Sequence, residues 1–185
     1  MIDIQDNFLS LKEFEQLHSG FLRWDFPWYT SKVVNDNEQN DMFNMQFIHF
    51  FYERYSPLGD QISMLQPIFQ RLQPIAIFKI KANIMPNQGK IIEHGLHIDV
   101  TDTETHKIRD HMKTSILYLN TNNGYTRFED GTKVESVANR MVFFDAELSH
   151  RGVSATDTRY RCVINFNWFT WSNYYKFDQN FDTYY

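Results

Sequence analysis

We expect the chain to be organised around one short stretch, His94-Gly95-Leu96-His97-Ile98-Asp99. If this stretch ends a β-strand, its side chains alternate between two faces, so His97 and Asp99 point the same way and Ile98 packs behind them. The same alternation turns His94 to the opposite face, which makes it a structural histidine or one at the rim of the site. An imidazole and a carboxylate that face one point predict part of a metal site.

His150 supplies a third candidate ligand. It comes just after a strongly apolar, strand-like run that contains Phe143 and Phe144. Without His150, a surface pair is the simpler interpretation of His97 and Asp99, because chance produces His-x-Asp in many sequences. Two imidazoles and one carboxylate on one face, with the opposite positions open, are the arrangement expected of non-haem Fe(II) oxygenases.

Length and composition favour a globular protein of one domain over residues 1–185. The chain has 185 residues, of which 42% are hydrophobic and 17% aromatic, enough for a sizeable core. Its net charge of -5 does not indicate binding to nucleic acid or to an anionic membrane, which usually requires an excess of basic residues. The single cysteine, Cys162, cannot form an internal disulfide, and no apolar run approaches membrane-spanning length. Because residues 1–6 carry no signal-peptide pattern, we expect a cytoplasmic protein.

Two amphipathic helices are expected in the N-terminal part, at about residues 8–73. The first begins with a capping box formed by Ser10 and Glu13, and the residues spaced to form its apolar face are Leu11, Phe14, Leu17, Phe21 and Leu22. The second is expected over residues 60–72, where Pro67 either kinks it or starts its second half. Between them, residues 45–52 are expected to form an aromatic strand. We expect both helices to flank the site rather than to form it.

Beyond Pro74 the pattern changes to short apolar or alternating runs separated by turn residues, which is typical of a β-sandwich or barrel. This expected core covers about residues 75–170, with strands near residues 75–84, 95–99, 114–120, 125–128, 133–137, 140–145 and 160–168. Residues 101–113 are so polar that we expect a solvated loop, placed to act as a lid over the site. His106 and His111 in this loop are therefore not expected to bind a metal.

The last expected strand, Tyr160-Arg161-Cys162-Val163-Ile164-Asn165-Phe166-Asn167-Trp168, adds a basic residue to the site. Its even positions are apolar or aromatic and should pack against the helices, so its odd positions face the interior. A guanidinium that points inward needs an anionic partner, and a ligand carboxylate is one candidate for Arg161. Arg159 shares this face but lies nearer the loop. Tyr118 could offer its hydroxyl to the same ligand.

An ordered set of segments resembles the Fe(II)/2-oxoglutarate-dependent dioxygenases. The set is most similar to the small prolyl 4-hydroxylase-like branch, including compact versions encoded by phages and marine bacteria, and it covers roughly residues 75–168. The resemblance implies a double-stranded β-helix, or cupin-like jelly roll, that is mainly β with flanking helices. It places the iron ligands, which form the catalytic centre, on His97, Asp99 and His150. The segments in question are His97-Ile98-Asp99, Thr114-Ser115-Ile116-Leu117-Tyr118-Leu119-Asn120, Gly124-Tyr125-Thr126-Arg127-Phe128, His150-Arg151-Gly152 and Arg161.

The resemblance also implies how the cosubstrate is held. The basic residue that pairs with the distal carboxylate of 2-oxoglutarate falls on Arg161, where animal prolyl hydroxylases of the collagen type carry lysine. The tyrosine that hydrogen-bonds the same carboxylate falls on Tyr118. On the strand before the metal motif, Asn83 is the candidate contact.

By the same resemblance, the reaction is a hydroxylation that uses Fe(II), 2-oxoglutarate and O2, releases succinate and CO2, and is supported by ascorbate as a reductant. The expected substrate is a peptide, with proline as the residue suggested by the branch, or a small polar molecule. The expected location is the bacterial cytoplasm, or the host cytoplasm if the chain is phage-encoded. The oligomeric state is left open.

Two other classes of protein stay open at this point. A metal-dependent, cupin-like enzyme without 2-oxoglutarate chemistry would keep His97, Asp99 and His150 but have no need for an inward Arg161. In a non-catalytic jelly-roll binding protein, the histidines would be incidental.

Overall fold

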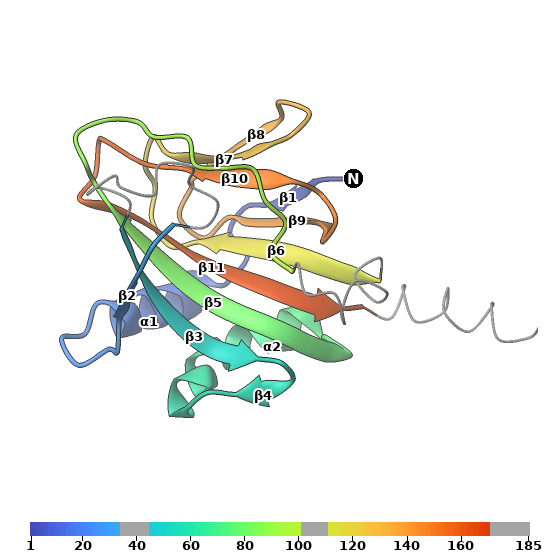
Figure 1. Cartoon of the computed structure of the whole chain (residues 1–185). Helices are drawn as coiled ribbons and strands as arrows, with labels where there is room; N and C mark the ends of the chain where they lie inside the picture. Colours follow the sequence, from blue (N-terminus) through green and yellow to red (C-terminus); the bar gives the residue numbers. More distant parts are fainter. Residues whose placement is uncertain (34–44, 101–110, 171–185) are drawn as a thin grey trace, which may run out of the picture.

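Two antiparallel sheets dominate the structure, which is a computed structural model describing residues 1–33, 45–100 and 111–170. In these residues the larger sheet has the strand order β1-β9-β6-β11-β5-β3-β2, with β4 added beside β3, and the smaller has the order β10-β7-β8 (Figure 1). The larger sheet comprises β1 (Asp3–Gln5), β9 (Met141–Asp145), β6 (Met112–Tyr118), β11 (Tyr160–Phe169), β5 (Ala76–Pro86), β3 (Gln46–Glu53), β2 (Tyr29–Ser31) and β4 (Ser56–Pro57). The smaller comprises β10 (His150–Val153), β7 (Tyr125–Phe128) and β8 (Lys133–Glu135).

The helices cover the outer face of the larger sheet. Helix α1 (Leu11–Phe21) begins at the predicted capping box, in which the Glu13 amide donates to Ser10 Oγ at 3.4 Å and the Ser10 amide donates to Glu13 Oε2 at 2.9 Å. The second predicted helix is a 3-10 helix, η1 (Asp60–Leu65), followed by α2 (Gln66–Leu72). Pro67 lies in the first turn of α2, so it starts this helix rather than kinking a longer one.

One side of α1 differs from the prediction. Phe14, Leu17 and Phe21 are buried against the sheet, whereas Leu11 is 72% and Leu22 51% exposed. An apolar residue of a helix is buried only where another part of the protein packs against it. Leu11 and Leu22 lie at the two ends of α1, where the described part of the chain does not cover them fully.

Strand β11 separates the hydrophobic core from the interior of the fold. Its even positions, Cys162, Ile164, Phe166 and Trp168, belong to a buried cluster with Leu17, Phe21 and Ile68 of the helices. Its odd positions face the smaller sheet, and Arg161, Val163 and Asn165 line a cavity between the two sheets. The predicted alternation along this strand is therefore confirmed.

The strand predicted at residues 95–99 is not formed. This segment runs along β10 and is joined to it by isolated bridges between Glu93 and Val153 and between His97 and His150. Because the segment is not a regular strand, its side chains do not alternate strictly, and His94 lines the same cavity as His97. The placement of His94 on the opposite face was therefore wrong, whereas its position in the cavity wall agrees with the alternative of a histidine at the rim of the site.

The remaining differences concern short or polar segments. Strands β1, β2, β4 and β10 were not predicted, and the first two lie at the edges of the larger sheet (Figure 1). Met112 and Lys113, predicted to belong to a loop, are the first residues of β6. Most of the predicted lid, residues 101–110, and the tail from residue 171 lie outside the described residues. Among the helices that are described, none is long and apolar enough to cross a membrane.

Candidate metal centre

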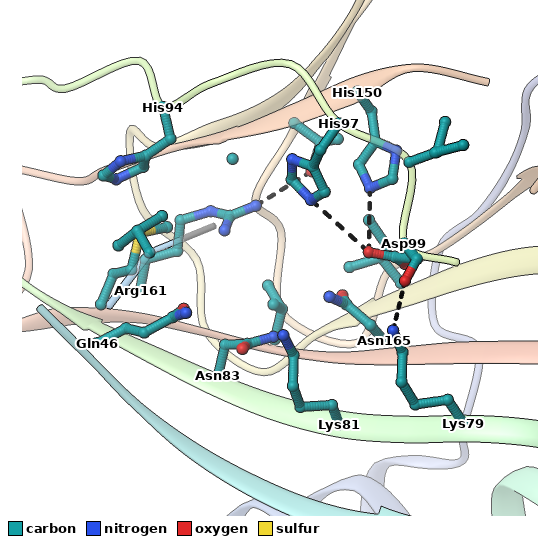
Figure 2. Close-up of a pocket in the computed structure, with 17 residues that line it drawn as sticks. Gln46, Lys79, Lys81, Asn83, His94, His97, Asp99, His150, Arg161 and Asn165 are labelled. Carbon is teal, nitrogen blue, oxygen red and sulfur yellow. Dashed lines mark hydrogen bonds and ion pairs between the residues drawn. The ribbon is translucent and has the colours of Figure 1, made fainter. Parts of the chain in front are cut away.

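Three side chains converge at one end of the cavity: His97, Asp99 and His150 (Figure 2). One potential ligand atom from each lies within 4.8 Å of the other two. Nε2 of His97 is 3.7 Å from Oδ1 of Asp99, and Nε2 of His150 is 3.9 Å from the same oxygen. The structure thus brings together the three residues that the sequence analysis selected.

Backbone hydrogen bonds hold the two histidines side by side. The amide of each donates to the carbonyl of the other at 2.9 Å, and the ring centroids are 4.9 Å apart. Nδ1 of His97 lies 3.1 Å from the Gly95 carbonyl, and Nδ1 of His150 lies 3.1 Å from the Leu148 carbonyl. A carbonyl oxygen can only accept, so each Nδ1 carries a proton, and in the neutral ring Nε2 then presents its lone pair to the common point.

Asp99 is held by neighbours on the larger sheet. Its carboxylate accepts from Asn167 Nδ2 at 3.3 Å, and its backbone carbonyl accepts from Lys79 Nζ at 2.5 Å. Burial raises the pKa of the Asp99 carboxyl, but the positive charges of His150 and His97 in their protonated forms, together with that of Lys79, outweigh this and hold the pKa below its ordinary value. The group is therefore an ionised carboxylate.

The donor set fits a divalent metal ion. Burial lowers the pKa of His97, which keeps its imidazole neutral, as a metal ligand must be. The side chains of His97, Asp99 and His150 are only 16%, 7% and 4% exposed, so bulk water does not compete strongly for them. Two imidazole nitrogens and one carboxylate oxygen on one side of a cavity match a facial triad for Fe(II).

The cavity beside this centre has a volume of about 300 Å³. Its floor is the inner face of the larger sheet, where Lys79, Lys81, Asn83 and Met85 of β5 run beside the odd positions of β11. This volume is at the lower end of the range of about 300–1,000 Å³ found for small-molecule pockets. It suits a compact ligand together with a small part of a second one.

Arg161 lies in this cavity, across from the metal centre, and is 3% exposed (Figure 2). Its Nε donates to Ser136 Oγ at 2.9 Å and its Nη2 donates to Thr126 Oγ1 at 3.1 Å. Among the described residues it has no carboxylate partner, and both of these hydrogen bonds go to neutral hydroxyl groups. Arg159, the competing candidate, is exposed to solvent.

Tyr118 lies directly behind the residues that contact Arg161. It is fully buried, its hydroxyl donates to Thr126 Oγ1 at 2.7 Å, and its ring centroid is 5.5 Å from Arg161 Cζ. Burial raises the pKa of Tyr118, which keeps the hydroxyl protonated and able to donate. Thr126, rather than Tyr118, is among the described residues that line the cavity.

Gly124 provides the space that Arg161 occupies. A Cβ atom at this position would lie 2.8 Å from Arg161 Cδ and 2.7 Å from the Val153 carbonyl oxygen. Both distances are well below a normal contact between carbon and a heavy atom. A glycine at position 124 therefore allows the buried guanidinium to lie where it does.

Comparisons with known proteins support this architecture at the level of the fold. No protein-family model matches the sequence, and no curated protein matches it either. Among solved structures, a prolyl-4-hydroxylase from Pseudomonas putida is similar, with a TM-score of 0.58, 21% identity and coverage of 91% of both chains. An oxidoreductase of the 2OG-Fe(II) oxygenase family from Burkholderia pseudomallei has a TM-score of 0.59, 12% identity and coverage of 91% of this chain and 84% of that one.

A third similar structure contains a bound peptide. It is a prolyl hydroxylase from Trichoplax adhaerens in complex with a fragment of the hypoxia inducible factor oxygen degradation domain, with a TM-score of 0.58, 16% identity and coverage of 93% of this chain and 84% of that one. Together with the two facing sheets, these similarities decide the architecture. The fold is a double-stranded β-helix.

Within this double-stranded β-helix, several residues of the cavity were not singled out from the sequence. Thr126 lay in a quoted segment without an assigned role, and Lys79 and Lys81 were not considered. A signal for the lysines exists, because polar residues recur at every second position of the otherwise apolar strand β5, at Lys79, Lys81 and Asn83. Such alternation marks the face of a strand that borders a polar interior.

Proposed function

We propose that this protein is an Fe(II)- and 2-oxoglutarate-dependent oxygenase that hydroxylates its substrate with release of succinate and CO2. In this proposal His97, Asp99 and His150 bind the iron. The observation that carries it is the position of a buried arginine without a carboxylate partner, Arg161, in the same cavity as three converged metal-binding side chains.

The arginine favours this function over the two alternatives. A cupin-like enzyme without 2-oxoglutarate chemistry gains nothing from a buried guanidinium, and burying one without an anionic partner costs several kcal/mol, on the order of the penalty for any unpaired buried ion. The distal carboxylate of 2-oxoglutarate supplies that partner. A non-catalytic binding protein would need neither the arginine nor two histidines whose Nε2 atoms are turned to one acid.

Each part of the site has a separate task in this proposal. When bound, the iron and 2-oxoglutarate would supply the oxidising chemistry, by which one oxygen atom of O2 enters a C–H bond of the substrate and the other enters the succinate that forms with CO2. The Gly95 and Leu148 carbonyls accept from Nδ1 of His97 and His150, which in the neutral rings leaves Nε2 as the atom that can bind the metal. Asn167, which is buried on β11, orients the Asp99 carboxylate.

The cosubstrate is held at the other end of the cavity. Arg161 pairs with its distal carboxylate, and Thr126, whose hydroxyl accepts from both Arg161 and Tyr118, can donate its own proton to the same carboxylate. Tyr118 then acts through Thr126 and by packing behind Arg161. Asn83, 7% exposed and with a buried carbonyl oxygen that has no hydrogen-bond partner among the described residues, is a further proposed contact.

For the substrate we propose a peptidyl residue, with proline as the first candidate, or a small polar molecule. The neighbour from Trichoplax adhaerens holds a peptide, and a cavity of about 300 Å³ has room for a side chain beside the cosubstrate. The finer assignments, namely the prolyl 4-hydroxylase-like branch, one domain over residues 1–185, a cytoplasmic location and ascorbate as reductant, belong to the same proposal.

A turnover assay tests the proposed function. Anaerobically purified protein is loaded with Fe(II), 2-oxoglutarate and ascorbate and exposed to O2, and succinate is measured with and without proline-containing peptides and small polar molecules. We expect slow succinate release alone, a several-fold increase with a true substrate, and none with Asp99→Ala. Lys12→Ala, an exposed change on α1, serves as the control. The absence of succinate, together with the absence of 2-oxoglutarate binding to metal-loaded protein, would reject the proposal.

A further inference from the structure

Lys81 is a cationic side chain of the cavity to which the proposed function gives no task. It lies on β5, in register with Asn165 of β11 and Phe50 of β3. Its side chain rises from the floor of the cavity beside Asn83, between Lys79 and the Arg161 end (Figure 2). Lys81 therefore lines the space in which a ligand must bind.

The ammonium group of Lys81 has no anionic contact of its own. It lies 5.8 Å from the centre of the Phe50 ring and makes no hydrogen bond or ion pair with another residue in the described part of the chain. Lys79, one pleat away, donates instead to the Asp99 carbonyl. Burial lowers the pKa of Lys81, since its ammonium loses water, while the charge of Asp99 acts in the opposite direction.

A second polar group faces the same space. Asn165 lines the cavity in register with Lys81, and its side-chain oxygen is buried without a hydrogen-bond partner among the described residues. The oxygen and nitrogen of such an amide can be exchanged by a flip, so Asn165 can present either a donor or an acceptor to a ligand. An unsatisfied amide beside an unpaired ammonium indicates a place for a polar ligand.

The charges of the occupied site leave an excess of positive charge. Fe(II) and the dianion of 2-oxoglutarate neutralise each other, so the described cavity wall retains the three cations Lys79, Lys81 and Arg161 against one carboxylate, Asp99. The chain as a whole has a net charge of -5, so this local excess does not follow from a basic composition. A substrate that brings negative charge would balance it.

Lys81 lies at the metal end of the cavity rather than at the arginine end. Arg161 is in register with Met85, four positions along β5 from Lys81, which corresponds to roughly 13 Å at the rise of a β-strand. The charge of Lys81 acts on both Asp99 and His97. The distal carboxylate of 2-oxoglutarate, which belongs to Arg161, is therefore not its partner.

We infer that the substrate carries a carboxylate or phosphate group, and that Lys81 and Asn165 hold this group beside the metal. This inference rests on the proposed function, because it assigns to substrate the charge that the metal and cosubstrate leave uncompensated. Lys81 would then determine which bond of the substrate faces the metal, since it fixes one end of the molecule at a set distance from the iron ligands. A neutral analogue of the same shape would bind poorly.

The test measures binding of small probes close to the metal. The protein is loaded with Mn(II) and N-oxalylglycine, an unreactive analogue of 2-oxoglutarate, and the paramagnetic relaxation of probe protons is recorded by NMR. The probes are acetate, methylphosphonate and neutral acetamide, with N-acetylaspartate methylamide and N-acetylasparagine methylamide to distinguish a peptide side chain from a free acid. We expect the three anionic probes to bind, so that their protons relax faster. The two neutral amides, acetamide and N-acetylasparagine methylamide, should bind at least tenfold more weakly.

Variants assign the binding to Lys81. Lys81→Met should weaken binding of the anionic probes at least tenfold, Lys81→Arg should retain it within about threefold, and Lys12→Met on the exposed face of α1 should change nothing. Circular dichroism melting curves show whether each variant is folded. Equal binding of acetate and acetamide, or unchanged anion binding in a folded Lys81→Met protein, overturns the inference.

Two further outcomes separate this inference from the proposed function. If Lys81→Met weakens N-oxalylglycine binding as much as Arg161→Met does, Lys81 is a cosubstrate contact, and the inference is wrong while the function stands. If Mn(II) and N-oxalylglycine do not bind, the proposed function fails. In that case methylphosphonate is titrated into metal-free protein by calorimetry, and a loss of its binding in Lys81→Met still supports an anion site at Lys81, whereas no loss rejects it.

Discussion

His97 and His150 hydrogen-bond to each other through their backbones, the amide of each donating to the carbonyl of the other at 2.9 Å. This bridge joins the segment after β5 to the first residue of β10, so two distant parts of the chain present their imidazoles side by side. Because the backbone makes the connection, the two residues are placed next to each other by hydrogen bonds that a metal ion does not have to supply.

The first prediction follows from this bridge. His97→Ala should abolish Fe(II) binding, with at least a hundredfold loss of affinity, yet leave the melting temperature within a few degrees of wild type, because a side chain that lines a cavity contributes little to packing. Calorimetric titration with Fe(II) under argon and a thermal melt measure the two effects. Retained Fe(II) affinity, or a protein that no longer folds, would contradict it.

The second prediction concerns the buried guanidinium. Arg161→Ala should weaken 2-oxoglutarate binding to the Mn(II)-loaded protein by about 2–5 kcal/mol, because the cosubstrate carboxylate is left buried and unpaired. The matched control is Arg159→Ala, which removes an exposed arginine two positions earlier in the chain. An Arg159→Ala protein that loses as much affinity as Arg161→Ala would show that the assignment of the role to Arg161 is wrong.

Gly124 allows a test of how Arg161 is positioned. In Gly124→Ala the new methyl group meets Arg161 Cδ and the Val153 carbonyl, so we expect a loss of about 1–3 kcal/mol in stability and a clear loss of 2-oxoglutarate affinity. Gly20→Ala in α1 is the control, since its Cβ meets only the flexible end of Met64. Urea unfolding and cosubstrate titration provide the two measurements, and cosubstrate affinity equal to wild type in Gly124→Ala would argue against the positioning role.

The fourth prediction concerns pH and a histidine that does not belong to the metal centre. His49 on β3 is 3% exposed, packs between Phe26 and Phe51, and has Nδ1 2.8 Å from the Pro27 carbonyl. Burial lowers its pKa, because the protonated ring is poorly solvated there. The unfolded chain, with an ordinary histidine pKa of about 6.5, takes up this proton more readily, so stability should fall as the pH drops below about 6.5 and stop falling below the folded-state pKa.

Urea unfolding of metal-free protein at pH 7.5 and pH 5.5 measures this effect. In His49→Gln the difference in unfolding free energy between the two pH values should be smaller than in wild type, since the contribution of His49 is removed while all other groups still titrate. An equal difference in both proteins would show that His49 does not carry the pH dependence.

Local patterns in the sequence were sufficient for several parts of the structure. The capping box joins Ser10 and Glu13, which are three positions apart, so it needs no contact with any other part of the chain. The inward position of Arg161 follows from alternation along a single strand, which every extended chain obeys. The start of α2 near Pro67 has the same local origin, because the proline ring fits the first turn of a helix.

Features that depend on a partner elsewhere in the chain were not predictable in this way. Strands β1, β2 and β10 are only three or four residues long and exist because a neighbouring strand supplies their hydrogen bonds. The exposure of Leu11 and Leu22 depends on how far the sheet extends beneath α1. His94 points into the cavity because the path of its segment is set by isolated bridges to β10 and not by a strand of its own.

The sequence by itself determined which residue types are available for a metal centre, a buried arginine and an alternating final strand, because these depend on residue chemistry and on periods of two or three to four positions. Only the tertiary structure decided that His150 meets His97 and Asp99, that Tyr118 lies behind Thr126, and that Lys81 and Asn165 face one space. Each of these relations joins residues far apart in the chain, and such a contact forms only when strand pairing and the closure of two sheets bring them together.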